Sequence, residues 1–137
     1  MVIDSFYSPA GKLAYLFARR RDVAFAGYRV VSGLGPILAD ATRVSTASVS
    51  HLESYSAEAQ RARLEMHCIE GADQVIRVLV NKSEVANASM APGRCTLATM
   101  IDLHKGYNDI AIEYSGSVAM RFDALVINRV SGPAAGN

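Results

Sequence analysis

The sequence predicts an all-β protein built as an antiparallel β-sandwich. Three observations support this fold class. Apolar and polar residues alternate with a period of two through much of the second half, the apolar positions are rich in β-branched residues, and turn-forming residues separate the alternating runs. The chain has 137 residues, half of them hydrophobic, which is enough to bury one core. We therefore expect a single domain over residues 1–137, with an irregular tail at 131–137.

The second half contains the clearest strands. In QVIRVLVN, for example, the apolar residues Ile76, Val78 and Val80 fall on one face. Four segments show this alternation and are expected to be strands: 74–81, 96–103, 109–115 and 118–130. The stretch 87–94 (NASMAPGR) is rich in turn formers and predicts the connection between the first two strands. Ser115-Gly116-Ser117 predicts a tight connection between the last two.

The first half is less regular. Residues 13–18 (LAYLFA) and 28–31 (YRVV) are apolar enough to form strands, and GLGP at 33–36 is a strong break after them. Residues 43–50 (RVSTASVS) alternate weakly, as an exposed or edge strand would. We therefore expect shorter strands here than in the second half.

The segment 51–63 supports two interpretations. Ser50 to Glu53 fits a helix capping box, and apolar residues recur after it at helical spacing. From Arg63 onward, however, RLEMHCI alternates as a strand does. We expect a loop or short helical turn that leads into a strand, and a short helix over residues 51–63 is the alternative.

Charge and hydropathy exclude several classes of partner. Lysine and arginine total 14 against 13 acidic residues, so the chain as a whole is not expected to bind nucleic acid. No apolar run approaches the length of a membrane span, and the order of charges near the N-terminus is the reverse of a secretory signal, so we expect synthesis in the cytoplasm. Arg19, Arg20 and Arg21 form one local cluster, which could contact an anion or a neighbouring subunit, or could keep an edge soluble.

The two cysteines lack the spacing of a metal or redox motif. Cys68 and Cys95 lie 27 positions apart. We expect two buried free thiols, with a disulfide as the alternative.

No set of residues points to catalysis. His51, His67 and His104 are isolated from one another, and no nucleophile, phosphate-binding or dinucleotide-binding motif occurs. We therefore expect a protein that is not an enzyme and that binds or assembles.

The last seventy residues or so resemble a known family. The segments RVLVNK, LHKGYNDIAI and DALVI match, in order, the pattern vNg, L-x-x-G-x-N-x-I and D-x-L-x-V. This pattern is similar to the C-terminal half of the carbohydrate-binding modules of the galactose-binding-like jelly-roll superfamily. The resemblance covers about half of the chain. It implies a jelly-roll-like antiparallel β-sandwich that binds a glycan.

The resemblance also implies site residues. Family sites commonly combine an aromatic platform with polar side chains, which places Tyr107 as the platform and Asn81, Asn108 and Asn128 as its hydrogen-bonding neighbours. Family members also hold a structural calcium through the aspartate of the last strand, which is Asp123 here. The N-terminal stretch offers only Asp4 where the family has glutamates, so we expect no cofactor, with a calcium at Asp123 as the alternative.

The absence of tryptophan decides between two functions at this stage. Sugar-binding platforms favour large aromatic side chains, and this chain has no tryptophan. We therefore expect a non-catalytic structural or attachment protein that partners other protein subunits, such as a head-decoration or tail-attachment component of a phage virion. The alternative is a carbohydrate-binding module, stand-alone or part of a larger protein, that recognises a glycan.

Overall fold

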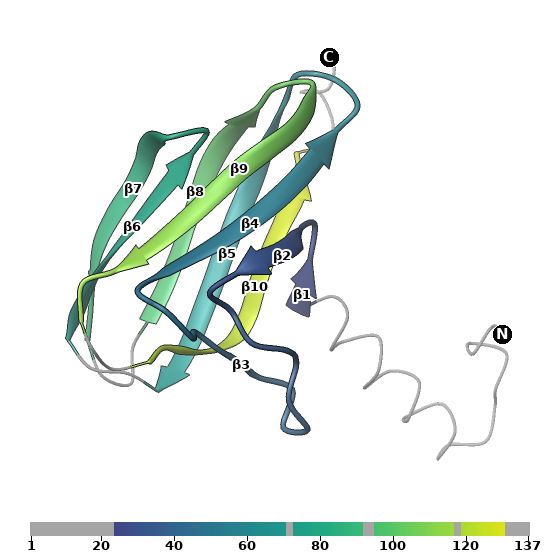
Figure 1. Cartoon of the computed structure of the whole chain (residues 1–137). Helices are drawn as coiled ribbons and strands as arrows, with labels where there is room; N and C mark the ends of the chain where they lie inside the picture. The colour runs from purple at the N-terminus through teal and green to yellow at the C-terminus, as the bar shows by residue number, and fades with distance from the viewer. Residues whose placement is uncertain (1–23, 71–72, 92–94, 117–118, 131–137) are drawn as a thin grey trace, which may run out of the picture.

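A computed structural model describes residues 24–70, 73–91, 95–116 and 119–130, and these form two β-sheets of five strands each (Figure 1). The first sheet has the order β1-β10-β5-β8, and β3 also pairs with β10. Its strands are β1 (Phe25–Ala26), β3 (Arg43–Val44), β5 (Gln60–Glu70), β8 (Cys95–Leu103) and β10 (Arg121–Arg129). The second sheet has the order β2-β4-β9-β6-β7. Its strands are β2 (Arg29–Ser32), β4 (Val49–Ser56), β6 (Gln74–Val80), β7 (Ser83–Met90) and β9 (Gly106–Tyr114).

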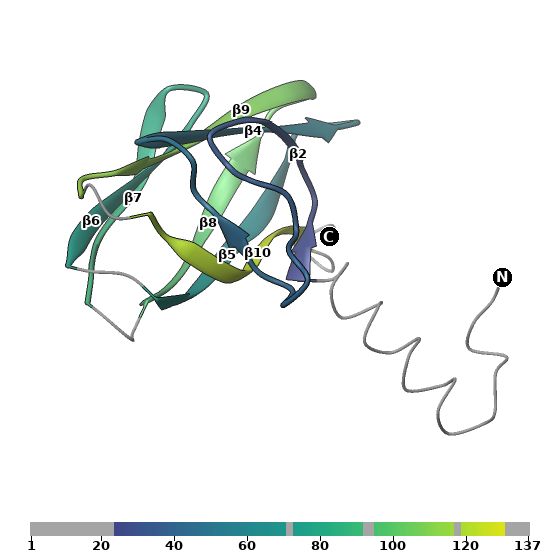
Figure 2. The same ribbon diagram turned by 60° about the horizontal axis from the view of Figure 1, so that its bottom comes forward.

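The two sheets face each other, as Figure 2 shows, and enclose the apolar core. All strand pairs are antiparallel except β1 with β10. The alternating runs of β6, β8 and β9 place every second side chain between the sheets, and β10 does so with a register shift between Phe122 and Ala124. This confirms the strands expected in the second half. Fully buried core residues come from both sheets, including Leu52, Ile76, Ile110, Phe122 and Leu125. Among the described residues, no helix is long and apolar enough to cross a membrane.

Neither expectation for residues 51–63 is correct. This segment forms most of β4, a short turn and the start of β5, so the helix is absent and the strand begins well before Arg63. The inward positions of β4 alternate, but three of them are the serines Ser50, Ser54 and Ser56, all buried. Because serine is polar, the sequence does not show the period of two in this segment. The remaining apolar residues happen to recur at helical spacing.

Two connections also differ from expectation. Residues 87–90 belong to β7 rather than to a loop. This strand packs Val85, Ala86 and Ala88 partly against the core and buries Met90 in it. The turn that precedes it is Asn81-Lys82, where both residues have positive φ (50° and 74°), as a two-residue type I′ hairpin requires. The segment after β9 leads to the opposite sheet, so it does not close a hairpin there.

Cys68 is disulfide-bonded, which corrects the expectation of free thiols. Its register partner on the neighbouring strand β8 is Cys95, the only other cysteine in the chain. A cross-strand position of this kind was not visible from the sequence spacing, because the register of β5 against β8 depends on the whole sandwich.

Two glycines and two serines hold the short edge strand β2 in place. Gly27 precedes β2 and Gly33 follows it, and both have positive φ. From the inner face of β4, Ser54 donates a hydrogen bond to the carbonyl of Gly27 (2.8 Å), and Ser50 donates one to the carbonyl of Gly33 (2.7 Å). A side chain at either glycine would lie 2.0 Å from a carbonyl oxygen, so close backbone approach requires glycine at both positions. The serines of β4 are therefore structural donors.

Three expectations lie outside the described residues. They are the strand at 13–18, the arginines Arg19, Arg20 and Arg21, and the irregular tail at 131–137.

Candidate functional site

The structure brings together three of the four residues expected to bind a ligand. Tyr107 and Asn108 are neighbours near the start of β9, and Asn81 lies in the adjacent turn between β6 and β7. Asn128 lies on β10, in the opposite sheet, where its register partner is Arg63 and its side chain is exposed. The group near Tyr107 therefore forms without Asn128.

Asn108 is a buried residue that stabilises the fold through its side-chain amide. Its side chain is 0% exposed. The oxygen Oδ1 accepts hydrogen bonds from the backbone N–H of His104 and from Nδ2 of Asn81, both at 2.9 Å. The nitrogen Nδ2 donates to the carbonyls of His104 (3.0 Å), Gly106 (3.2 Å) and Ser54 (3.3 Å). These contacts use both acceptor positions and both donors of the amide, so Asn108 joins β4, β9 and the turn before β9.

Asn81 holds the neighbouring turn against the same strand. Its Oδ1 accepts the backbone N–H of Asp109 (2.9 Å), while its own backbone N–H donates to the carbonyl of Asp109 (2.7 Å). Its Nδ2 is the donor to Asn108. Both asparagines thus fix the position of the backbone beneath Tyr107.

Tyr107 has an aromatic partner that sequence reasoning did not find. Tyr55 on β4 is its direct register partner, and the two rings meet edge to face with centroids 5.2 Å apart and an interplanar angle of 62°. Tyr55 is 55% exposed and Tyr107 is 65% exposed. Both side chains project from the outer face of the second sheet, on the side away from the core. Two large aromatic surfaces in solvent, held against each other, make this pair the most prominent candidate for a contact surface.

Two carboxylates lie directly beside the tyrosine pair. The next outward-facing register pair along β4 and β9 is Glu53 with Asp109. Glu53 is bound by Arg29 of β2, whose guanidinium donates to Oε1 at 2.6 Å. This hydrogen bond raises the pKa of Arg29 above its ordinary value, and Tyr107 adds a smaller electrostatic contribution. The ring nitrogen Nδ1 of His51 lies 4.0 Å from Oδ1 of Asp109.

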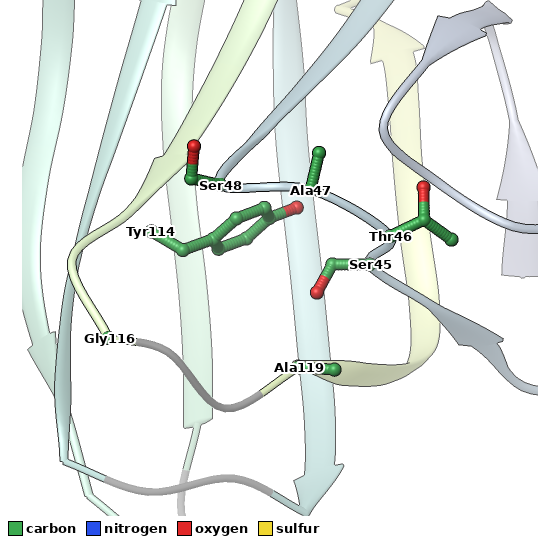
Figure 3. A pocket seen from close by; sticks show the side chains of 7 residues that line it. All are labelled: Ser45, Thr46, Ala47, Ser48, Tyr114, Gly116 and Ala119. Atoms are coloured by element: carbon green, nitrogen blue, oxygen red, sulfur yellow. The ribbon is translucent and has the colours of Figure 1, made fainter.

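A concave feature lies at the other end of β9. It is a hollow of about 360 Å³ lined by Ser45, Thr46, Ala47, Ser48, Tyr114, Gly116 and Ala119 (Figure 3). The hydroxyl of Tyr114 pairs with Oγ of Ser50 at 2.7 Å. Because the single proton of Ser50 is donated to Gly33, the tyrosine is the donor in this pair. Burial raises the pKa of Tyr114 to about 12, so the phenol is neutral at ordinary pH.

Asp123, the residue named for the calcium alternative, has a histidine partner. The carboxylate of Asp123 contacts the imidazole of His67 across β10 and β5. Within the described ranges, no three histidine, cysteine, aspartate or glutamate side chains come close enough to hold a metal ion. Asp4 lies outside these ranges.

Comparison with known proteins finds a likeness in structure alone. No protein-family model and no curated protein sequence matches the chain. A family 35 carbohydrate-binding module from Cellvibrio japonicus superposes with a TM-score of 0.52 at 16% identity, covering 82% of this chain and 93% of the module. The family 35 module from Paenibacillus barcinonensis gives 0.51 at 13% identity, covering 79% and 96%. The fold is that of a family 35 carbohydrate-binding module.

This likeness confirms the jelly-roll-like β-sandwich expected from the sequence. A similar match joins the chain to a β-(1,4)-mannanase of Podospora anserina that carries a family 35 module (TM-score 0.51, 14% identity); it covers 82% of this chain and only 27% of that longer one. These structures give no support to the head-decoration or tail-attachment function. Each of them is, or carries, a family 35 carbohydrate-binding module. Partner subunits stay a prediction.

Proposed function

We propose that this chain is a non-catalytic glycan-binding module and that the Tyr55–Tyr107 pair is its binding platform. The single observation that carries the proposal is an exposed, mutually supported aromatic pair with hydrogen-bonding carboxylates beside it, on a fold shared with carbohydrate-binding modules.

The chemistry of the pair suits a pyranose ring. A sugar presents an apolar face of C–H groups and an equatorial rim of hydroxyls. The face stacks on an aromatic ring, which accounts for an affinity contribution on the order of 1 kcal/mol beyond the area buried. The rim then reaches acceptors such as Glu53 and Asp109, whose Cα atoms are one register step away on the same outer face.

The platform is also held in place before any ligand arrives. The ring of Tyr55 limits the rotation of Tyr107, and Asn108 and Asn81 fix the backbone that carries Tyr107. A side chain that is already ordered loses less conformational entropy on binding. This compensates in part for the lack of tryptophan, which led the sequence interpretation toward an assembly role.

The test is affinity electrophoresis of the whole chain in gels that contain soluble polysaccharides, followed by titration calorimetry with any polymer that retards it. Tyr107→Ala and Tyr55→Ala should each weaken binding about tenfold, since one ring contact amounts to roughly 1–2 kcal/mol. The matched control is Val75→Ala, at an exposed apolar residue of the same sheet on β6. This variant should bind as the unmodified protein does.

A second variant tests the location. Ala119→Trp places a large side chain in the hollow beside Tyr114 and should leave glycan binding unchanged. If it abolishes binding while both tyrosine variants bind normally, the platform is wrongly placed. If the unmodified chain binds no polysaccharide and no glycan on an array, the proposed function itself is wrong.

A further inference from the structure

We infer that the tyrosine platform selects glycans that carry hydrogen-bond donors and no anionic group, and rejects uronic-acid and sulfated polymers. This inference rests on the proposed function and adds the class of ligand. It follows from the distribution of charge around the pair.

The register pair directly beside the platform consists of two acceptors. Glu53 and Asp109 face each other across β4 and β9, immediately next to the register pair Tyr55 and Tyr107. Their side chains are 31% and 51% exposed, so both can be reached by a ligand that lies along the sheet. Two carboxylates directly opposite each other repel, and a third negative charge above them adds to that repulsion.

The two arginines in the strands of this sheet, Arg29 and Arg77, are already bound to carboxylates. Arg29 donates to Glu53 at 2.6 Å. Farther along the sheet, Arg77 donates to Glu84 at 2.8 Å and to Glu113 at 2.7 Å. An anionic sugar that used either arginine would have to break one of these pairs, leaving a carboxylate beside its own charge. A neutral sugar hydroxyl, by contrast, donates to the carboxylate without displacing anything.

Asp109 is the most exposed acceptor beside the pair. Its neighbour His51 approaches it only to 4.0 Å, which is longer than a hydrogen bond. Its carboxylate is therefore available to accept from two adjacent hydroxyls at once. Vicinal hydroxyls on a neutral hexose, or a hydroxyl beside an ammonium group on an amino sugar, meet this geometry, and a carboxylate or sulfate does not.

The test measures retardation of the whole chain by two groups of polymers at low and moderate salt. The neutral group is galactomannan, xyloglucan and mixed-linkage β-glucan, and the anionic group is polygalacturonate and alginate, with glycol chitosan as the aminated probe. We expect at least one neutral or aminated polymer to retard the chain. Retardation by the anionic polymers should be at least tenfold weaker at low salt.

Asp109→Asn and Glu53→Gln change charge without changing shape. Each substitution should reduce the ratio of retardation by neutral polymers to retardation by anionic polymers about threefold or more, because it removes one repulsive charge beside the platform. The matched control is Glu84→Gln on β7, which removes a carboxylate bound to Arg77. This variant should leave the ratio of neutral to anionic retardation unchanged. Lys82 and Lys105 lie in the turns on either side of Tyr107 and are the cations that could attract an anion instead.

The outcomes separate the two proposals. Strong retardation by an anionic polymer, lost in Tyr107→Ala and in the double variant Lys82→Ala/Lys105→Ala, would keep the module function and overturn the inference about ligand class. The inference would also be overturned if neutral polymers bind but neither Asp109→Asn nor Glu53→Gln changes the ratio of neutral to anionic retardation. Failure of every probe to retard the chain would remove the proposed function, and the ligand class with it.

Discussion

Replacing Asn108 with alanine tests whether this buried amide stabilises the tyrosine end of the sandwich. The amide takes part in about four full-strength hydrogen bonds, two accepted and two donated, and its side chain is 0% exposed. Each such bond contributes about 1 kcal/mol to the free energy of unfolding. In the variant, the backbone N–H of His104 and Nδ2 of Asn81 can donate to water instead. We therefore expect the free energy of unfolding to fall by about 3 kcal/mol.

The assay is urea denaturation followed by circular dichroism, with a thermal melt alongside. For a domain of this size, 3 kcal/mol lowers the midpoint temperature by roughly 10 °C. The control is Asn128→Ala, because Asn128 is the same residue type in an exposed strand position and should change stability by less than about 0.5 kcal/mol. If the two variants are equally stable, or if Asn108→Ala loses glycan binding at full stability, Asn108 is a ligand-binding residue and the structural reasoning fails.

Three further predictions concern the backbone, the disulfide and the buried phenol. Gly33→Ala should cost more than about 3 kcal/mol or prevent folding, because the added Cβ would lie 2.0 Å from the Val49 carbonyl at a φ of 80°. Gly106→Ala, with a φ of 102° and no atom within 4 Å, should cost only about 1 kcal/mol of strain; equal urea midpoints would contradict this. Cys68→Ser should lower stability by about 3 kcal/mol, and a reducing agent should lower the unmodified protein to the same level without affecting the variant. Because the pKa of Tyr114 is raised to about 12 from 10.0, the folded state favours the neutral phenol. Stability should therefore fall as pH rises from about 10 to about 12, by about 2–3 kcal/mol from this group, and less steeply in Tyr114→Phe; an identical pH profile would refute the assignment.

The strands that could be predicted are those whose inward residues are large. β6, β8 and β9 turn isoleucine, valine or leucine inward at most of their alternate positions, so the period of two is visible in the sequence. β10 buries Phe122, Leu125 and Ile127, because its register shifts between Phe122 and Ala124. β4 buries Ser50, Ser54 and Ser56 instead, and β7 turns mainly alanines inward, so both were assigned to other structure. A small polar residue can be buried only where it finds hydrogen-bond partners elsewhere in the fold. A short stretch of sequence does not contain those partners.

The candidate site shows the same division. Tyr107 could be singled out because it is an aromatic residue beside a Gly-x-Asn turn. Tyr55 could not, because the pairing of β4 with β9 joins segments about fifty residues apart, and β4 itself was not recognised. Asn108 was recognised as part of a motif and expected to bind a ligand, and its burial could not be read from the sequence. Its inward position follows from the strand starting at Gly106, three residues before the expected start at 109.

The hydrogen bonds from Ser50 and Ser54 that hold the two ends of β2 have a consequence for solubility. An edge strand presents unpaired N–H and C=O groups to other molecules and is a template for intermolecular pairing. β2 is the edge next to the tyrosine face, and it is only four residues long because glycines in left-handed conformations interrupt the extended chain at both ends. Ser50 and Ser54 hold those interruptions in place. A second molecule therefore finds too short a ladder to extend at this edge, and the sheet can present exposed aromatic rings beside it with less risk of edge-to-edge aggregation.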